Sequence, residues 1–150
     1  MTTQLTLGEL EGTAGRDLGT SEWHTIEQRH IDLFAEATGD HQWIHVDREA
    51  AATGPFGGTI AHGYLTLSML PALMSEVLNV AGARMGINYG IDRVRFTAPV
   101  PSGSEVRLHA RLLSSERRGE GILYRVGVQI ETRGQEKPAC VGEVLYLAFG

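Results

Sequence analysis

Ten consecutive residues carry more proton-handling side chains than any other part of this 150-residue sequence. The stretch from Thr38 to Asp47 reads Thr-Gly-Asp-His-Gln-Trp-Ile-His-Val-Asp and holds two histidines and two aspartates. A histidine titrates near neutral pH, and a carboxylate close to it can orient it or share a proton with it. We therefore interpret Asp40 and His45 as an acid/base pair that holds one water molecule.

Two other interpretations of this stretch remain open. Asp40, His41, His45 and Asp47 are all residue types that bind metals. Two histidines four residues apart share a side only on a continuous helix, and Gly39 indicates that a helix has just ended. Alternatively, Asp40 caps a turn and His45 is an ordinary loop residue. We favour the acid/base pair, without a metal ion or an organic cofactor.

A second candidate is the His62-Gly63 pair, which opens a long apolar stretch. A glycine at the start of a helix exposes its amide N–H at the positive end of the helix dipole. An N–H aimed at a carbonyl oxygen would stabilise an enolate or another oxyanion. The alternative is that Gly63 only allows close packing and that His62 makes a structural hydrogen bond.

Helix signals surround both candidates. Thr25 and Gln28 have the spacing of a capping box, which predicts a helix that starts at Thr25 and ends at Gly39. Residues 41–59 are typical of a loop with one helical turn at 48–52. Residues 63–79 are apolar on nearly every side, which predicts a helix enclosed by the rest of the protein, with a looser turn at Pro71.

The second half of the chain predicts strands, because apolar and polar residues alternate there. The predicted strands are 87–96, 106–112, 122–130 and 139–149, after an irregular lead-in at 1–19 and a short strand at 22–26. The alternation changes parity near Asp92-Arg93, which predicts a β-bulge or a bend. Residues 139–149 are apolar on both faces, which is typical of a central strand or of a strand near a subunit contact.

An apolar helix is followed by consecutive strands. This order predicts an α+β fold with an antiparallel sheet curved around the helix. One small sheet leaves its edges unprotected, so we expect a homodimer that extends the sheet.

The composition fits one globular domain spanning residues 1–150, with 42% apolar and 21% charged residues. The net charge of −5 disfavours nucleic acid as a partner. The single cysteine, Cys140, should be a buried thiol. No signal-peptide pattern opens the chain, and the apolar stretch 64–78 is too short to cross a membrane. We expect a cytoplasmic protein that does not bind membranes.

Residues 37–45 resemble the hydratase 2 motif of the MaoC-like, R-specific enoyl-CoA hydratases. That motif runs Gly-Asp-any-Asn-Pro-apolar-His, and Asp40 and His45 match its catalytic residues. Gln42 and Trp43 stand where the family usually has Asn and Pro. Residues 60–63, Ile-Ala-His-Gly, are similar to the family's His-Gly segment at the start of its central helix.

The resemblance implies a hot-dog fold, in which a sheet wraps a long helix, and usually a homodimer. It also implies reversible addition of water to a trans-2-enoyl-CoA, giving the (R)-3-hydroxyacyl-CoA, with the Gly63 amide as oxyanion donor. The residues expected near the acyl-CoA substrate are His62, Gln42, Asn88 and Arg93. Two alternatives stay open, which are a non-catalytic acyl-thioester-binding protein and an acyl-CoA thioesterase.

Overall fold

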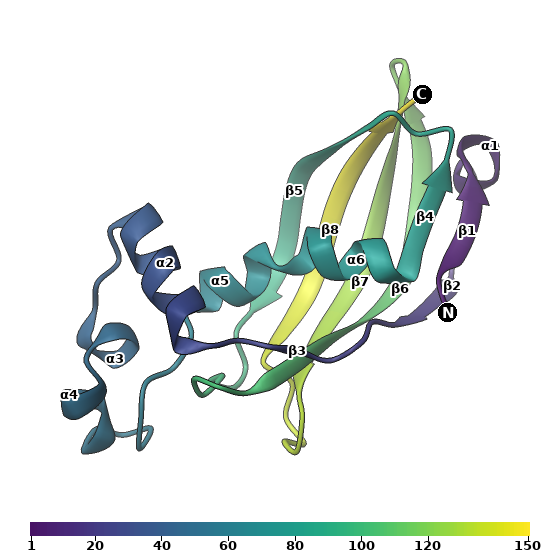
Figure 1. Ribbon diagram of the computed structural model, residues 1–150. Helices are drawn as coiled ribbons and strands as arrows, with labels where there is room; N and C mark the ends of the chain where they lie inside the picture. The colour runs from purple at the N-terminus through teal and green to yellow at the C-terminus, as the bar shows by residue number, and fades with distance from the viewer.

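A strongly curved antiparallel sheet forms one side of the molecule (Figure 1). The computed structural model describes residues 1–150. Five strands follow the order β2-β6-β7-β8-β5, and the short β3 also pairs with β6. Their bounds are Arg16–Thr20 (β2), His24–Thr25 (β3), Met85–Arg95 (β5), Glu105–Arg118 (β6), Gly121–Thr132 (β7) and Cys140–Phe149 (β8). The predicted antiparallel α+β hot-dog architecture is confirmed, and β8 is a central strand as expected.

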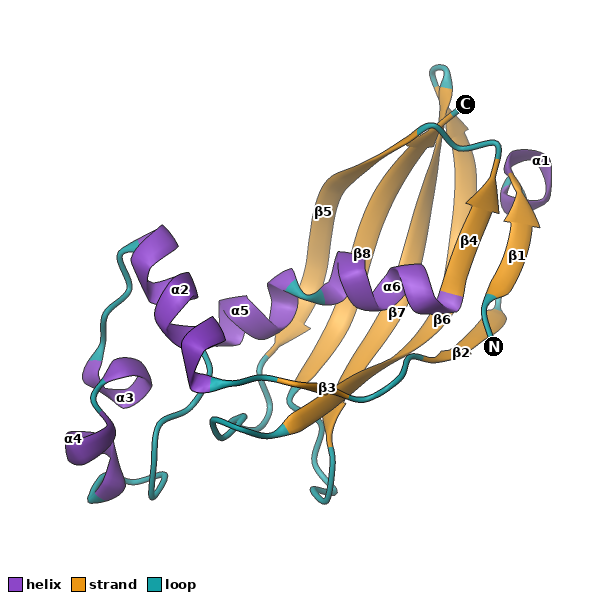
Figure 2. Cartoon of the chain, viewed as in Figure 1, coloured by secondary structure: helices purple, strands orange, loops and turns teal.

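The central helix lies across the concave face of this sheet (Figure 2). It consists of two pieces, α5 (Gly63–Ser68) and α6 (Leu70–Val77). The helix is interrupted at Met69. This break places Pro71 in the first turn of α6, where a missing backbone N–H costs least. The predicted loosening is confirmed, but the single helix 63–79 was wrong, because the chain becomes a strand at Leu78.

The expected irregular lead-in at residues 1–19 was also wrong. It contains β1 (Thr3–Thr6), α1 (Leu7–Leu10) and β2. β1 pairs in parallel with β4 (Leu78–Ala81). Such a pairing joins distant segments, and a pattern read along one short stretch does not reveal it. The strand predicted at 22–26 shrinks to β3.

Three short helices extend beyond one end of the sheet, α2 (Gln28–Thr38), α3 (Trp43–Val46) and α4 (Arg48–Ala52) (Figure 1). Glu27, not Thr25, caps α2, in a reciprocal pair with His30. The predicted end of α2 is confirmed, since Gly39 adopts a left-handed φ of 81°. The turn at 48–52 is confirmed as α4, whereas α3 was expected to be loop.

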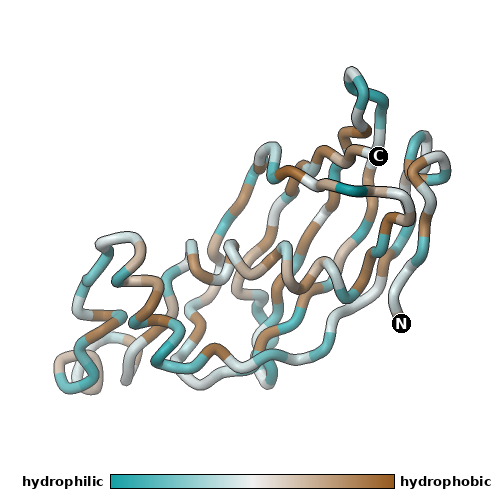
Figure 3. The backbone as a smooth tube through the Cα atoms, turned by 45° about the horizontal axis from the view of Figure 1, so that its top comes forward, coloured by the Kyte–Doolittle hydropathy of each residue, from teal (hydrophilic) through white to brown (hydrophobic).

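The core lies between the sheet and α6, as one cluster of 25 buried residues. Apolar and polar residues alternate along much of the sheet (Figure 3), and β6, β7 and β8 each turn one face to the core. Cys140 is fully buried, and burial raises the pKa of its thiol to about 11, so the thiolate is scarce at neutral pH. None of the helices has the length and apolar character needed to cross a membrane.

Strand β5 forms one edge of the sheet and is exposed along almost its whole length. The predicted bulge is confirmed, because the pairing with β8 shifts between Asp92 and Arg95 and Arg93 has a φ of 53°. Ile87, Tyr89 and Ile91 are each exposed by at least two-fifths of their surface. The edge therefore presents apolar side chains beside unpaired backbone groups.

Candidate active site

His45 is held in one tautomer by the neighbouring loop. It lies on α3 and is 7% exposed. Its Nδ1 is 2.7 Å from the carbonyl oxygen of Ile60, so Nδ1 carries the proton and donates it to that oxygen. The amide of Ile60 in turn donates to the carbonyl of Ile44 at 3.0 Å. The other ring nitrogen, Nε2, is therefore the one with a free lone pair.

Gln28 anchors the same region from α2, a role that was not predicted from the sequence. Its side-chain amide donates to the carbonyl of His45 at 2.8 Å and to Asp32 at 2.9 Å. Its oxygen accepts the hydroxyl of Thr59 at 2.6 Å. Gln28 is buried on the same side of α2 as Ile31. Gln28 lies at the helical spacing of the buried apolar residues Ile31 and Ala35, and this position could have identified it from the sequence.

Asp40 follows directly after the end of α2 and is exposed. Its carboxylate accepts the amide N–H of Gln42 at 3.3 Å. Its carbonyl oxygen accepts a hydrogen bond from Nε2 of His62 at 3.0 Å. These two bonds fix the backbone around Asp40 and leave carboxylate lone pairs free. Gln42 is placed beside Asp40 through its backbone, and its side chain is exposed.

His62 lies behind the acid/base pair and is 2% exposed. Its ring stacks on that of His45, with centroids 3.9 Å apart and an angle of 25° between the planes. Because its Nε2 donates to Asp40, its Nδ1 is an acceptor, and that buried atom has no partner. The predicted substrate contact of His62 stays a prediction, and its stacking and hydrogen bond show how the residue is held. His62 links Asp40 to His45 and positions both.

Asp40, His45 and His62 together bring one ligand-capable side-chain atom each within 4.8 Å of one another. The spacing resembles that of a metal site. A metal lies close to the plane of each imidazole that binds it, and stacked rings direct their lone pairs side by side. The stack therefore favours positioning over shared ligation. The absence of a metal and of a cofactor stays a prediction.

Gly63 is the first residue of α5, so its N–H has no acceptor within the helix. Gly63 and His45 line one cavity of about 310 Å³, together with Thr66, Phe56 and Phe96. A Cβ built on Gly63 would lie 2.8 Å from the Phe96 ring. Only glycine allows this close approach of the Phe96 ring to the start of α5.

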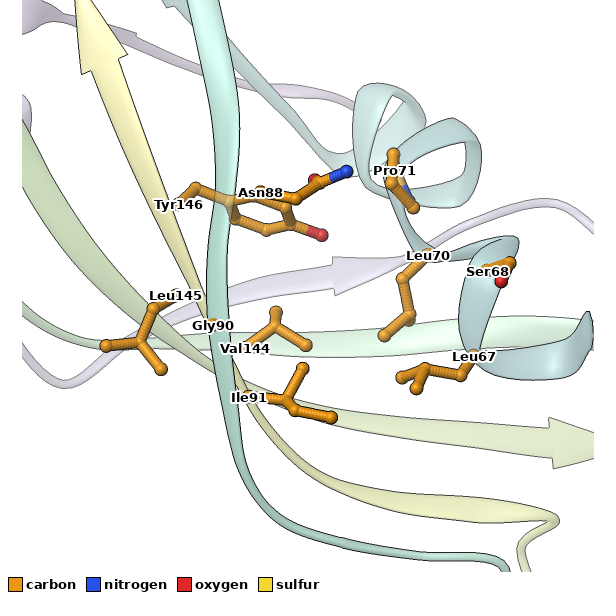
Figure 4. Close-up of a pocket in the computed structure, with 10 residues that line it drawn as sticks. All are labelled: Leu67, Ser68, Leu70, Pro71, Asn88, Gly90, Ile91, Val144, Leu145 and Tyr146. Carbon is orange, nitrogen blue, oxygen red and sulfur yellow. The ribbon is translucent and has the colours of Figure 1, made fainter. Parts of the chain in front are cut away.

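Asn88 and Arg93 lie apart from this cavity. Asn88 lines a separate cavity of about 250 Å³ between the central helix and strands β5 and β8 (Figure 4). Helix α5 contributes to the lining of both cavities, through Gly63 and Thr66 in the first and through Leu67 and Ser68 in the second. The Arg93 side chain is 85% exposed and 4.0 Å from Glu143. The structure thus brings Asp40, His45 and His62 together. Gly63 lines the same cavity as His45. Arg93 lies apart from them, at the edge of the sheet.

Comparison with known proteins assigns this arrangement to a family. The model of the MaoC like domain matches residues 9–133. The chain is 50% identical over 151 residues to 3-hydroxyacyl-thioester dehydratase Z of Mycobacterium tuberculosis, covering 99% of this chain and 100% of that protein. It is 49% identical to Nodulation protein N of Rhizobium leguminosarum, covering 91% and 86%. The structure of R-hydratase PhaJ1 from Pseudomonas aeruginosa superimposes with a TM-score of 0.75 at 28% identity, covering 97% and 86%. The chain belongs to the MaoC-like family, and within it to the dehydratases, which are hydro-lyases.

Proposed function

We propose that this protein hydrates trans-2-enoyl-CoA thioesters to (R)-3-hydroxyacyl-CoA and catalyses the reverse dehydration. One observation carries the proposal. His45 and Gly63 line the same cavity, and a carboxylate oxygen of Asp40 lies within 4.8 Å of a ring nitrogen of His45. The names of the M. tuberculosis dehydratase and the P. aeruginosa R-hydratase support the substrate class and the stereochemistry.

In this mechanism a water molecule lies between the Asp40 carboxylate and Nε2 of His45. Nδ1 of His45 is already donating to Ile60, so Nε2 is free to accept a proton from the water. The water oxygen forms a bond to Cβ of the substrate, and the electrons of the double bond move toward the thioester oxygen. The Gly63 N–H stabilises that oxygen as it becomes an enolate. A proton then returns from the acid/base pair to Cα, which completes the addition.

The cavity in Figure 4 suits the acyl chain. Six of its ten lining residues are hydrophobic, and helix α5 lines both this cavity and the one that holds His45 and Gly63. Leu67, Leu70, Ile91 and Val144 surround its interior (Figure 4). An apolar chain gains free energy by leaving water for such a site. Asn88 is the polar residue at this cavity from the predicted substrate-binding set.

The direct test is loss of the enoyl-thioester absorbance when crotonyl-CoA is added to the purified protein. Chiral analysis of the product should give the R isomer. Release of free CoA would instead support a thioesterase, and saturable binding without turnover would support a non-catalytic binding protein. Activity should be insensitive to prior treatment with a chelator. Formation of the S isomer would contradict the stereochemical part of the proposal.

We also propose that the working form is a homodimer joined along the β5 edge. Sedimentation should give twice the mass of one chain. Placing Glu at both Ile87 and Ile91 should produce monomers, because each buried charge at an apolar contact is costly. Leu33→Glu is the matched control, since Leu33 is 61% exposed on α2, away from that edge. A wild-type protein that sediments as a monomer would contradict this interface. So would a Leu33→Glu control that also becomes monomeric.

A further inference from the structure

Thr66 is a buried hydroxyl with no hydrogen-bond partner. It is 2% exposed, and its Oγ1 makes no hydrogen bond. A polar group taken out of water without a partner costs about 1–3 kcal/mol. Such groups are rare in folded proteins, and each one calls for an explanation.

The usual explanation for a helical threonine does not apply here. Threonine and serine hydroxyls in helices commonly donate to the carbonyl four residues earlier. In this protein Ser68 donates to Tyr64 at 2.6 Å, and Thr38 donates to Phe34 at 2.7 Å. The equivalent acceptor for Thr66 is the carbonyl of His62, and the Thr66 hydroxyl makes no such bond.

The location of Thr66 explains the missing partner. Thr66 lines the same cavity as His45 and Gly63. It lies three residues after Gly63 in α5, so the two residues share one side of the helix. A helical side chain also leans toward the N-terminal end of its helix, which brings the hydroxyl toward Gly63.

We propose that Thr66 is a catalytic residue that donates a second hydrogen bond to the thioester oxygen. The inference rests on the proposed hydratase function and extends it. Two donors that share one acceptor, each at about 2.9 Å, can lie up to about 6 Å apart. Positions three apart on a helix are about 5–6 Å apart. The hydroxyl and the Gly63 N–H together would stabilise the enolate oxygen, and the hydroxyl is satisfied only when substrate is bound.

The test replaces Thr66 by Val, which keeps the shape and removes the hydroxyl. Removing one oxyanion donor lowers kcat by about 10²–10³-fold, so kcat for crotonyl-CoA should fall by about 10²-fold with little change in KM. Thr66→Ser keeps the donor and should retain most of the activity. The carbonyl stretch of bound butyryl-CoA, which does not react, should move to higher frequency in the Val variant.

Thermal stability separates this role from a structural one. Because the hydroxyl has no partner in the folded protein, Thr66→Val should melt at the wild-type temperature or above it. A fixed partner, such as Nδ1 of His62, would make the same variant less stable. Thr132→Val is the matched control, because Thr132 is equally buried and unpartnered on β7 and lies outside both cavities. It should leave kcat unchanged.

These measurements test the role of Thr66 separately from the hydratase function. An active wild type with an equally active Thr66→Val variant would overturn the role of Thr66 and leave the hydratase function standing. A lower melting temperature in Thr66→Val than in Thr66→Ser would also overturn it. A wild type that binds crotonyl-CoA without hydrating it would overturn the function and the donor role together.

Discussion

Replacing Asp40 by Asn, or His45 by Gln, should lower kcat for crotonyl-CoA hydration by about 10²–10⁴-fold. Both changes keep a similar shape and remove a group that handles protons. In Asp40→Asn the side-chain amide still offers an oxygen to the N–H of Gln42, so the loop should keep its form. Steady-state kinetics at saturating substrate measures the loss directly.

The double variant is informative because Asp40 and His45 are proposed to hold the same water. Groups that act as a unit give non-additive losses, so removing both should cost little more than removing one. His41→Gln is the matched control, since this exposed histidine is in the same loop and lies outside the cluster that the pair forms with His62. Unchanged activity in both single variants would end the proposed mechanism.

Gly63→Ala should lower kcat by about 10²-fold, because the new methyl group would have to displace the Phe96 ring and so misplace the lining of the cavity. The added Cβ would lie 2.8 Å from two ring atoms, closer than real Cβ contacts occur. Phe96 is 43% exposed, so its ring can swing outward, and the cost should fall on the cavity more than on stability. Kinetics and thermal melting of the same variant measure the two effects separately.

A second change tests the cause of that loss. Phe96→Leu reduces the clash, so it should restore part of the activity of Gly63→Ala although it adds nothing to the wild type. A double-mutant cycle then gives the coupling free energy between Gly63 and Phe96. Gly58→Ala is the matched control, because a Cβ on Gly58 meets nothing within 4 Å. Additive effects of the two changes would show that the Phe96 contact is not the reason.

The sequence determined the parts of the fold that local patterns encode. Alternation predicted the buried faces of β6 and β7, and Gly39 predicted the end of α2, because each signal lies within one turn or one strand. The same approach failed for β1 and β4. Their pairing joins Thr3 to Leu78, and two short strands carry too little pattern to indicate a distant partner.

At the active site, the sequence determined which groups are available, and only the tertiary structure decided how each one is held. Spacing marked Asp40 and His45, but the tautomer of His45 depends on Ile60, which the fold brings next to it. His62 became a buried support because its ring stacks on His45. The orphaned hydroxyl of Thr66 likewise exists only in the folded protein. Hydrogen bonds and burial depend on neighbours in space, and a linear sequence specifies those neighbours only through folding.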